Sequence, residues 1–322
     1  MVPNYLTRRE FLGRTGTAAA LAVANPGAWG KVATSPVRPL RLGGPIFLKS
    51  DDPAELAQEH RRLGYRAAYA PQVGVNDSDR IKAILKEFAA RDVALAEVGA
   101  WRNMLDPEPE RRRQNLAYVQ ERLALAELLG ARCCVDIAGS YNPQLWDGPD
   151  PKNITDEFID ATVENCRHVI DAVKPTRTKF TIEMMPFSFP TGPDDYLRLI
   201  KSVDRPAFAV HLDVCNVMNC PERMYNNGAV IDGCFRKLGP WIVSCHAKDL
   251  AWEPYVQVSL REVIPGRGQI DYRAYLRGLS GLPVDAPLML EHLKTADEYD
   301  EGRHYIQKVA ADMGLSLGAE GA

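Results

Sequence analysis

The sequence predicts a single-domain α/β protein, a (β/α)8 barrel that follows a short N-terminal segment. Eight short apolar runs, rich in β-branched or aliphatic residues, alternate with amphipathic segments of helical period. Buried runs of this kind are typical of a parallel sheet that is covered on both faces. From residue 39 on, no low-complexity stretch or linker interrupts the alternation. An open, doubly wound sheet is the alternative, and the lack of a Gly-x-Gly-x-x-Gly sequence after any early strand weakens it.

The apolar runs give the predicted strands, in order along the chain. They lie near residues 41–48, 66–71, 93–101, 132–140, 179–186, 207–213, 242–250 and 287–293. The segments between them are long enough for one helix each, which is the repeating unit of a barrel.

Start and stop signals delimit the predicted helices. Pro53–Leu63 follows two aspartates, a good N-cap with proline in the first turn. Asp77–Ala90 carries apolar residues at the i, i+3, i+4, i+7 positions of one helix face. Pro109–Leu129 is the longest and stops at Gly130, a candidate for a left-handed cap. The remaining predicted helices are Ile154–Val173, Asp194–Ile200, Gly228–Leu238, Asp271–Leu279 and Ala296–Met313.

Length, composition and charge fit an ordinary globular domain. The chain has 322 residues, of which 46% are hydrophobic and 25% charged. The net charge is −3, from 39 basic and 42 acidic residues, and the one basic block, residues 111–113, is expected on a solvated helix face. Because nucleic-acid affinity depends on phosphate neutralisation, this balance argues against nucleic acid as the main partner.

Residues 1–38 are predicted to be a twin-arginine export signal and a linker, ahead of a barrel domain at 39–322. The segment Thr7–Leu12 contains paired arginines and precedes a modestly apolar stretch, Gly16–Val23, which is too short to span a bilayer. We therefore expect export, with the periplasm as the destination. Since that route carries folded proteins, the seven cysteines, which include no CxxC pair, are expected to be free and mostly buried.

Four polar residues stand near the ends of the last four predicted strands: Glu183, Asp213, His246 and Glu291. Their spacing of roughly 30 to 45 residues is about one strand–helix unit, so a barrel brings them to one mouth. Three carboxylates and one imidazole form a hard, oxygen-rich set that suits one divalent ion, Mn²⁺ first, with Mg²⁺, Co²⁺ or Zn²⁺ also compatible. The alternative is four unrelated polar residues at strand ends.

Strand parity extends this prediction, because successive side chains point to opposite faces. Asp213 facing inward brings His211 inward one layer deeper. His246 facing inward brings Lys248 to the rim above it. His292, one residue beyond the last of the four, is expected to face the helices and to be structural.

Several segments resemble the xylose-isomerase-like TIM barrel superfamily, specifically its sugar phosphate isomerase/epimerase group. They are TIEMMPFSFP, HLDVCNVMN, CHAKDL, IPGRGQIDY and LMLEHL, with EVGAWRNML extending the match to the third strand. The resemblance implies that the same four residues hold the metal ion and that Glu183 and Glu291 also transfer protons. A metal ion that chelates a ketone oxygen and its neighbouring hydroxyl acidifies the C–H between them and stabilises the enediolate. The alternative is that either glutamate is a ligand only.

Two further residues bear on the reaction. Asn216 stands where ketose 3-epimerases have a histidine, so its contact with substrate is expected to differ from theirs. Lys248 resembles the His-x-Lys-Asp arrangement of inosose-handling relatives and could polarise a carbonyl or hold an anionic group. A surface lysine paired with Asp249 is the alternative. Glu183, Glu291 and Lys248 are thus the candidate catalytic residues.

The other candidate substrate-binding residues lie at strand exits and in loops. Glu97 and Asn103 are expected to face the substrate, and His211 to orient Asp213 or touch the substrate. Trp101 either stacks on a sugar face or packs at the rim. Arg267 either reaches over the pocket to a hydroxyl, carboxylate or phosphate or is an exposed loop arginine.

The leading functional hypothesis is a metal-dependent sugar or polyol isomerase or epimerase with a small carbohydrate substrate. The alternatives are a lyase or hydrolase of keto-glycosides and a non-catalytic sugar-binding barrel. The apurinic endonuclease branch shares the barrel but needs three zinc ions and a histidine-rich site. This chain has six histidines, most of them on helices or facing away, so a DNA-repair function is not expected. No membrane span is expected, and assembly into a homo-oligomer is left open.

Overall fold

The computed structural model describes residues 39–317, and these form a closed barrel of eight parallel strands. The order around the ring is β1-β10-β7-β6-β5-β4-β3-β2, so neighbours in the chain are neighbours in the ring. The predicted barrel is therefore confirmed and the open sheet is excluded. The barrel strands are β1 (Leu42–Gly43), β2 (Ala67–Tyr69), β3 (Ala94–Gly99), β4 (Cys133–Ile137), β5 (Lys179–Glu183), β6 (Phe208–Asp213), β7 (Ile242–Ala247) and β10 (Leu288–Leu290).

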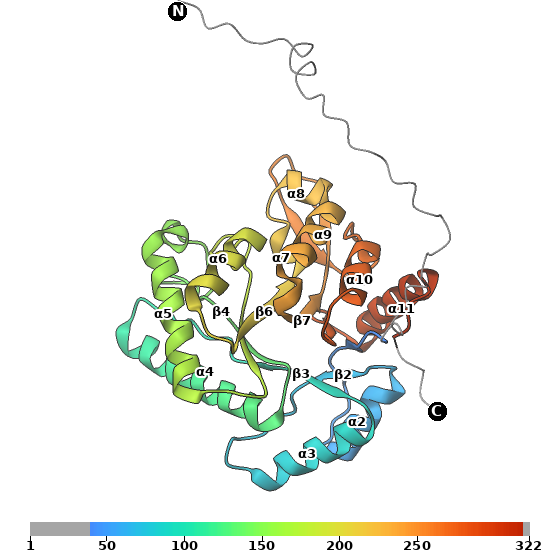
Figure 1. The fold of residues 1–322 in the computed structure, drawn as a ribbon. Helices are drawn as coiled ribbons and strands as arrows, with labels where there is room; N and C mark the ends of the chain where they lie inside the picture. The colour runs from blue at the N-terminus through green and yellow to red at the C-terminus, as the bar shows by residue number, and fades with distance from the viewer. Residues whose placement is uncertain (1–38, 318–322) are drawn as a thin grey trace, which may run out of the picture. The chain divides into compact units, whose positions relative to one another are not determined.

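The longer helices surround the strands (Figure 1). The predicted caps are present: the Asp52 side chain accepts a hydrogen bond from the Ala54 amide (2.9 Å), and Gly130 ends its helix at φ 59°. These helices are α2 (Pro53–Arg62), α3 (Ser78–Ala90), α4 (Pro109–Leu129), α5 (Asp156–Val173), α6 (Pro193–Val203), α9 (Asn227–Leu238), α10 (Tyr272–Ser280) and α11 (Ala296–Asp312).

The main departure from the predicted elements lies after the seventh strand. The predicted run 242–250 ends as barrel strand at Ala247, and the chain then enters β8 (Asp249–Trp252). This strand pairs antiparallel with β9 (Leu260–Val263) in a hairpin outside the barrel. Two short helices that were not predicted, α7 (Val214–Val217) and α8 (Pro221–Tyr225), follow β6.

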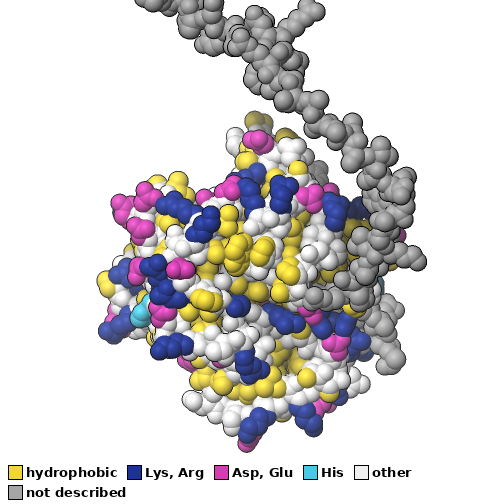
Figure 2. Space-filling view, in the orientation of Figure 1, with side chains coloured by type: hydrophobic (Ala, Val, Ile, Leu, Met, Phe, Trp, Pro, Cys, Tyr) yellow, Lys and Arg dark blue, Asp and Glu magenta, His cyan; other side chains and the backbone are white. Residues whose placement is uncertain are grey.

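The buried side chains between strands and helices are mainly apolar, and all seven cysteines are unpaired, six of them buried. No helix within residues 39–317 is both long and apolar enough to cross a membrane. On the face seen in Figure 2, basic and acidic side chains are interspersed. The predicted export signal lies outside the described residues.

Candidate metal centre

The four predicted metal-ligating residues come together at the carboxyl-terminal ends of the strands. Glu183 and Asp213 are the last residues of β5 and β6, His246 is the penultimate residue of β7, and Glu291 follows β10. Asp213 and His246 are register partners on adjacent strands. One side-chain ligand atom from each of the four residues lies within 4.8 Å of the others.

The carboxylates of this cluster leave two buried oxygens without a well-directed hydrogen bond. Asp213 Oδ1 caps α7 by accepting from the Cys215 amide (2.8 Å), which turns Oδ2 toward the cluster. Neither Asp213 Oδ2 nor Glu291 Oε1 accepts a hydrogen bond of acceptable geometry. Both oxygens instead lie within 2.8 Å of the Lys248 ammonium, so they are positioned to contact a cation.

His246 presents its two ring nitrogens to different partners. Nδ1 lies 2.7 Å from Glu291 Oε1 and 3.4 Å from Glu183 Oε1, whereas Nε2 lies 3.2 Å from Glu97 Oε2. Nδ1 is therefore the nitrogen that can ligate a metal ion. A carboxylate on the far nitrogen of a ligating histidine fixes its tautomer and raises its basicity, and Glu97 occupies that position.

Glu97 lies beneath the cluster and is 1% exposed. Its Oε1 is 2.9 Å from His211 Nε2 and accepts a hydrogen bond from Ser244 Oγ (2.6 Å). Burial alone would raise the pKa of Glu97, but His211 and His246 outweigh burial and hold that pKa well below its usual value. The burial and these partners indicate that Glu97 supports the two histidines and does not make the predicted contact with substrate. His211 lies one layer below the cluster, as strand parity predicts.

Lys248 places a second cation among the carboxylates and is 4% exposed. Its Nζ lies 2.8 Å from Asp213 Oδ2, 2.7 Å from Glu291 Oε1 and 3.9 Å from Glu183 Oε1. Burial lowers the pKa of Lys248, but the surrounding carboxylates outweigh burial and raise it well above its usual value. The interpretation as a surface lysine paired with Asp249 is wrong, because the Asp249 carboxylate instead accepts hydrogen bonds from the backbone amides of residues 250, 266, 268 and 270.

The donor set fits one divalent ion. Three carboxylates and the Lys248 ammonium carry a formal charge of −2, which one divalent ion balances. Burial lowers the pKa of His246, but Glu291, Glu97 and Glu183 outweigh burial and raise it well above its usual value. The same carboxylates that favour a proton on Nδ1 favour a metal ion there. Oxygen donors with one imidazole suit Mn²⁺ and Mg²⁺.

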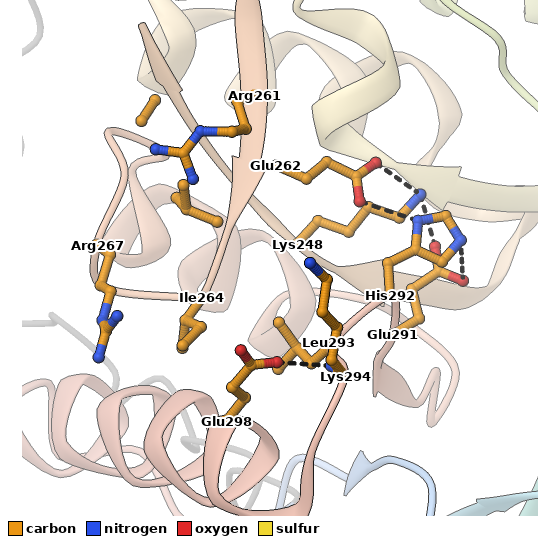
Figure 3. A pocket seen from close by; sticks show the side chains of 12 residues that line it. Lys248, Arg261, Glu262, Ile264, Arg267, Glu291, His292, Leu293, Lys294 and Glu298 are labelled. Atoms are coloured by element: carbon orange, nitrogen blue, oxygen red, sulfur yellow. Dashed lines mark hydrogen bonds and ion pairs between the residues drawn. The ribbon is translucent and has the colours of Figure 1, made fainter. Parts of the chain in front are cut away.

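A cavity of about 410 Å³ opens beside Glu291 and Lys248, walled by the β8–β9 hairpin (Figure 3). His292 lines this cavity at φ 61°, is 57% exposed and lies 2.9 Å from Glu262. The prediction that His292 faces the helices is therefore wrong. Strand parity does not reach this residue, because β10 ends at Leu290 and the positive φ reverses the side-chain direction.

The remaining predicted substrate contacts differ in position. The Trp101 ring centroid is 6.3 Å from that of His246, so this residue borders the cluster. Asn216 donates a hydrogen bond to Glu183 Oε1 (2.9 Å) and so orients a candidate ligand. Arg267 lines the cavity but is bound by Glu301 and points away from Lys248 in Figure 3.

Asn103 has a structural role that was not predicted. It is buried, its Nδ2 donates to the Ser140 carbonyl (2.7 Å), and its Oδ1 accepts from the Leu105 and Ser140 amides (2.9 Å each). Both ends of this amide bond backbone, so Asn103 joins two loops, and the same residue lines a second cavity at the mouth of the barrel.

Three further residues near the mouth, in loops and in the hairpin, were not predicted from the sequence. Glu262 of β9 lies 3.7 Å from Lys248 Nζ, and the Lys294 side chain extends into the cavity (Figure 3). Trp146 lines a second cavity on the other side of the mouth. None of these residues belongs to a segment with a clear hydrophobic period. Their aromatic or charged side chains, in the segments that follow barrel strands, were the only signal in the sequence.

Comparison with known proteins places this chain in a family. The family model described as xylose isomerase-like TIM barrel matches residues 55–309. The comparison with curated proteins gave no match. Among solved structures, a xylose isomerase-like TIM barrel protein from Mycobacterium smegmatis in complex with magnesium is 19% identical, with a TM-score of 0.57 over 82% of this chain and 89% of that chain.

Two epimerases share the fold. D-psicose 3-epimerase from Clostridium cellulolyticum H10, with D-tagatose, is 16% identical, with a TM-score of 0.61 over 87% of this chain and 100% of that chain. 3-Keto-D-glucoside 4-epimerase from E. coli is 14% identical, with a TM-score of 0.60 over 84% and 99% of the two chains. At these identities the structural likeness establishes the fold, and the family model spans most of the barrel. The chain therefore belongs to the xylose isomerase-like TIM barrel family.

Proposed function

We propose that the protein is a divalent-metal-dependent isomerase or epimerase that moves a proton on a sugar or polyol through an enediolate. The observation that carries the proposal is the convergence of Glu183 and Glu291 on a buried space that they share with His246 and Lys248. Their strands are separated by β6 and β7 in the ring, so the carboxylates approach this space from different sides. That arrangement suits removal of a proton from one face of a carbon and return to the other.

Each residue of the cluster has a distinct part in this proposal. Asp213 and His246 serve as ligands, because Asp213 Oδ2 already contacts a cation, the Lys248 ammonium, and His246 Nδ1 faces the carboxylates. Glu183 and Glu291 combine ligation with proton transfer. The Lys248 ammonium, buried beside both glutamates, stabilises negative charge that develops on a substrate oxygen. When bound, a divalent ion would supply Lewis acidity toward the carbonyl and hydroxyl oxygens of the substrate.

The names of related proteins are consistent with this chemistry. Two proteins of the same fold are epimerases, one of a ketose and one of a keto-glucoside, and a third protein of this fold was solved in complex with magnesium. Proton transfer next to a carbonyl is common to both epimerisations. We propose Mn²⁺ as the first ion to test, with Mg²⁺, Co²⁺ and Zn²⁺ as alternatives of the same donor class.

Exchange of carbon-bound protons in D₂O tests the proposal. The Mn²⁺-loaded full chain is incubated with D-fructose, D-psicose, D-tagatose and a 3-keto-glucoside, and deuterium uptake beside the carbonyl is followed by NMR. We expect uptake with at least one of them, and its loss in Glu183→Gln but not in Glu164→Gln, an exposed pair to Arg167 on α5. Release of the aglycone without an isomer would instead support the keto-glycoside lyase. No exchange with any of these substrates would overturn the proposal.

A further inference from the structure

A second cavity of about 470 Å³ opens at the mouth of the barrel, on the side of β3 and β4. Two tryptophans, Trp101 and Trp146, line it together with Arg102, Asn142 and Gln144. We call it the tryptophan cavity. Its volume falls within the roughly 300–1,000 Å³ of small-molecule sites. In the ring, β3 and β4 lie across from β7 and β10, which carry the cavity beside Glu291.

Trp101 connects the tryptophan cavity with the four candidate metal ligands, which we call the metal-ligand cluster (Glu183, Asp213, His246 and Glu291). Its ring lies 6.3 Å from that of His246, and the same residue lines the cavity. The position of this ring depends on Gly99, since a Cβ there would collide with the Trp101 indole. A ligand held at the cluster therefore lies next to a cavity with room for a further group.

Trp146 is an exposed indole on a loop that is held in place. It is 43% exposed, although large apolar side chains are normally packed. The loop around it is fixed by hydrogen bonds from Ser140 Oγ to the Gly148 carbonyl (2.7 Å) and from Asn142 Nδ2 to the Pro149 carbonyl (2.8 Å). An aromatic ring fixed at a cavity wall without packing against the core is typical of a ligand-binding surface.

The polar part of the cavity complements these rings. The Gln144 side chain makes no hydrogen bond with any residue of the described part of the chain, so its amide is free to donate and accept. Sugar rings present apolar C–H faces and peripheral hydroxyls, which aromatic faces and amides match. The two indoles and the amide therefore fit a pyranose or furanose ring.

We propose that the tryptophan cavity binds a second ring of the substrate, which makes the substrate a glycoside or disaccharide whose reacting sugar lies at the metal-ligand cluster. This inference rests on the proposed function for the position of the reacting sugar. The cluster lies next to Trp101, so one glycosidic bond can join a ring at the ligands to a ring in the cavity.

Binding of matched sugars to the Mn²⁺-loaded full chain tests the proposal. The probes are D-fructose and four disaccharides that contain it, namely lactulose, maltulose, turanose and isomaltulose, with dissociation constants from calorimetry or saturation-transfer NMR. We expect at least one disaccharide to bind about tenfold more tightly than D-fructose, the scale of one ring–aromatic contact. Trp146→Ala should abolish that advantage and leave the affinity for D-fructose unchanged. Leu145→Ala is the matched control, an exposed neighbour in the same loop that does not line the cavity.

The inference is overturned if no disaccharide binds more tightly than D-fructose, or if Trp146→Ala weakens both probes equally or neither. Because binding is measured without turnover, the two proposals fail in different ways. A disaccharide advantage that depends on Trp146, without proton exchange, would sustain the second-ring site and reject the isomerase. Proton exchange with free ketoses, without tighter binding of any disaccharide, would support the isomerase and reject the second-ring site.

Discussion

Replacing Glu97 by glutamine removes one buried charge beneath the metal-ligand cluster and keeps the shape of the side chain. Glu97 is buried below the barrel mouth. Its Oε2 lies 3.2 Å from His246 Nε2, and its Oε1 lies 2.9 Å from His211 Nε2. The variant therefore separates support of a ligand from ligation itself. We expect it to fold and to bind a divalent ion more weakly.

The magnitude follows from what the carboxylate does for His246. Loss of a partner behind a ligating histidine typically costs about 10- to 100-fold in metal affinity. That range corresponds to about 1.4–2.7 kcal/mol. It is close to the roughly 1.5–3 kcal/mol of one hydrogen bond to a charged group, which glutamine replaces by a contact with a neutral amide.

The assay is calorimetric titration of Mn²⁺ into full chain that has been stripped with EDTA and dialysed. Glu164→Gln is the charge-matched control and should bind within about twofold of the wild type. Ser244→Ala removes one donor to Glu97 (2.6 Å) without removing a charge, so its effect should be smaller than that of Glu97→Gln. A Glu97→Gln variant that folds and still binds Mn²⁺ as tightly as the wild type would refute the role of Glu97 as a support for the ligating histidine.

Three further variants test other parts of the structure. Lys248→Met should lower kcat at least tenfold without weakening Mn²⁺ binding. It should also destabilise the EDTA-stripped protein by roughly 3–5 kcal/mol in urea unfolding, because it leaves buried carboxylates without their counter-charge. Asp249→Ala should lower stability by roughly 2–4 kcal/mol, since its carboxylate accepts from the amides of residues 250, 266, 268 and 270; an unchanged urea midpoint would contradict this. Burial depresses the pKa of His60 below its usual 6.5, so its contribution is fully present above about pH 6.5 and is lost as the pH falls. His60→Asn should therefore flatten the fall in melting temperature between pH 7 and 5, and an equally steep fall would contradict the argument.

The candidate metal-ligating residues could be predicted because they lie on or directly after regular strands. In a parallel barrel, strand ends meet at one mouth. The order and spacing along the chain were therefore enough to predict that Glu183, Asp213 and His246 lie close together. Strand parity then correctly predicted His211 one layer below and Lys248 above, because both lie on or directly after regular strands.

The incorrect or incomplete predictions concern residues beyond strand ends. His292 follows β10 at a positive φ, where the alternation of side chains no longer holds. Asn103 lies in a loop whose backbone needs its amide, and sequence does not reveal which polar loop residues are committed in this way. Trp146 lies in a non-periodic loop, and only the folded chain shows that its indole faces a cavity next to Trp101.

The most direct test of the metal centre is the metal content of the purified full chain after saturation with Mn²⁺ and removal of the free ion by gel filtration. The wild type should retain one divalent ion per chain, and Glu183→Gln and Asp213→Asn should each lose most of it while keeping the wild-type circular dichroism spectrum. A wild-type protein that retains no ion, or folded variants that retain as much as the wild type, would contradict the assignment of this cluster as a metal site.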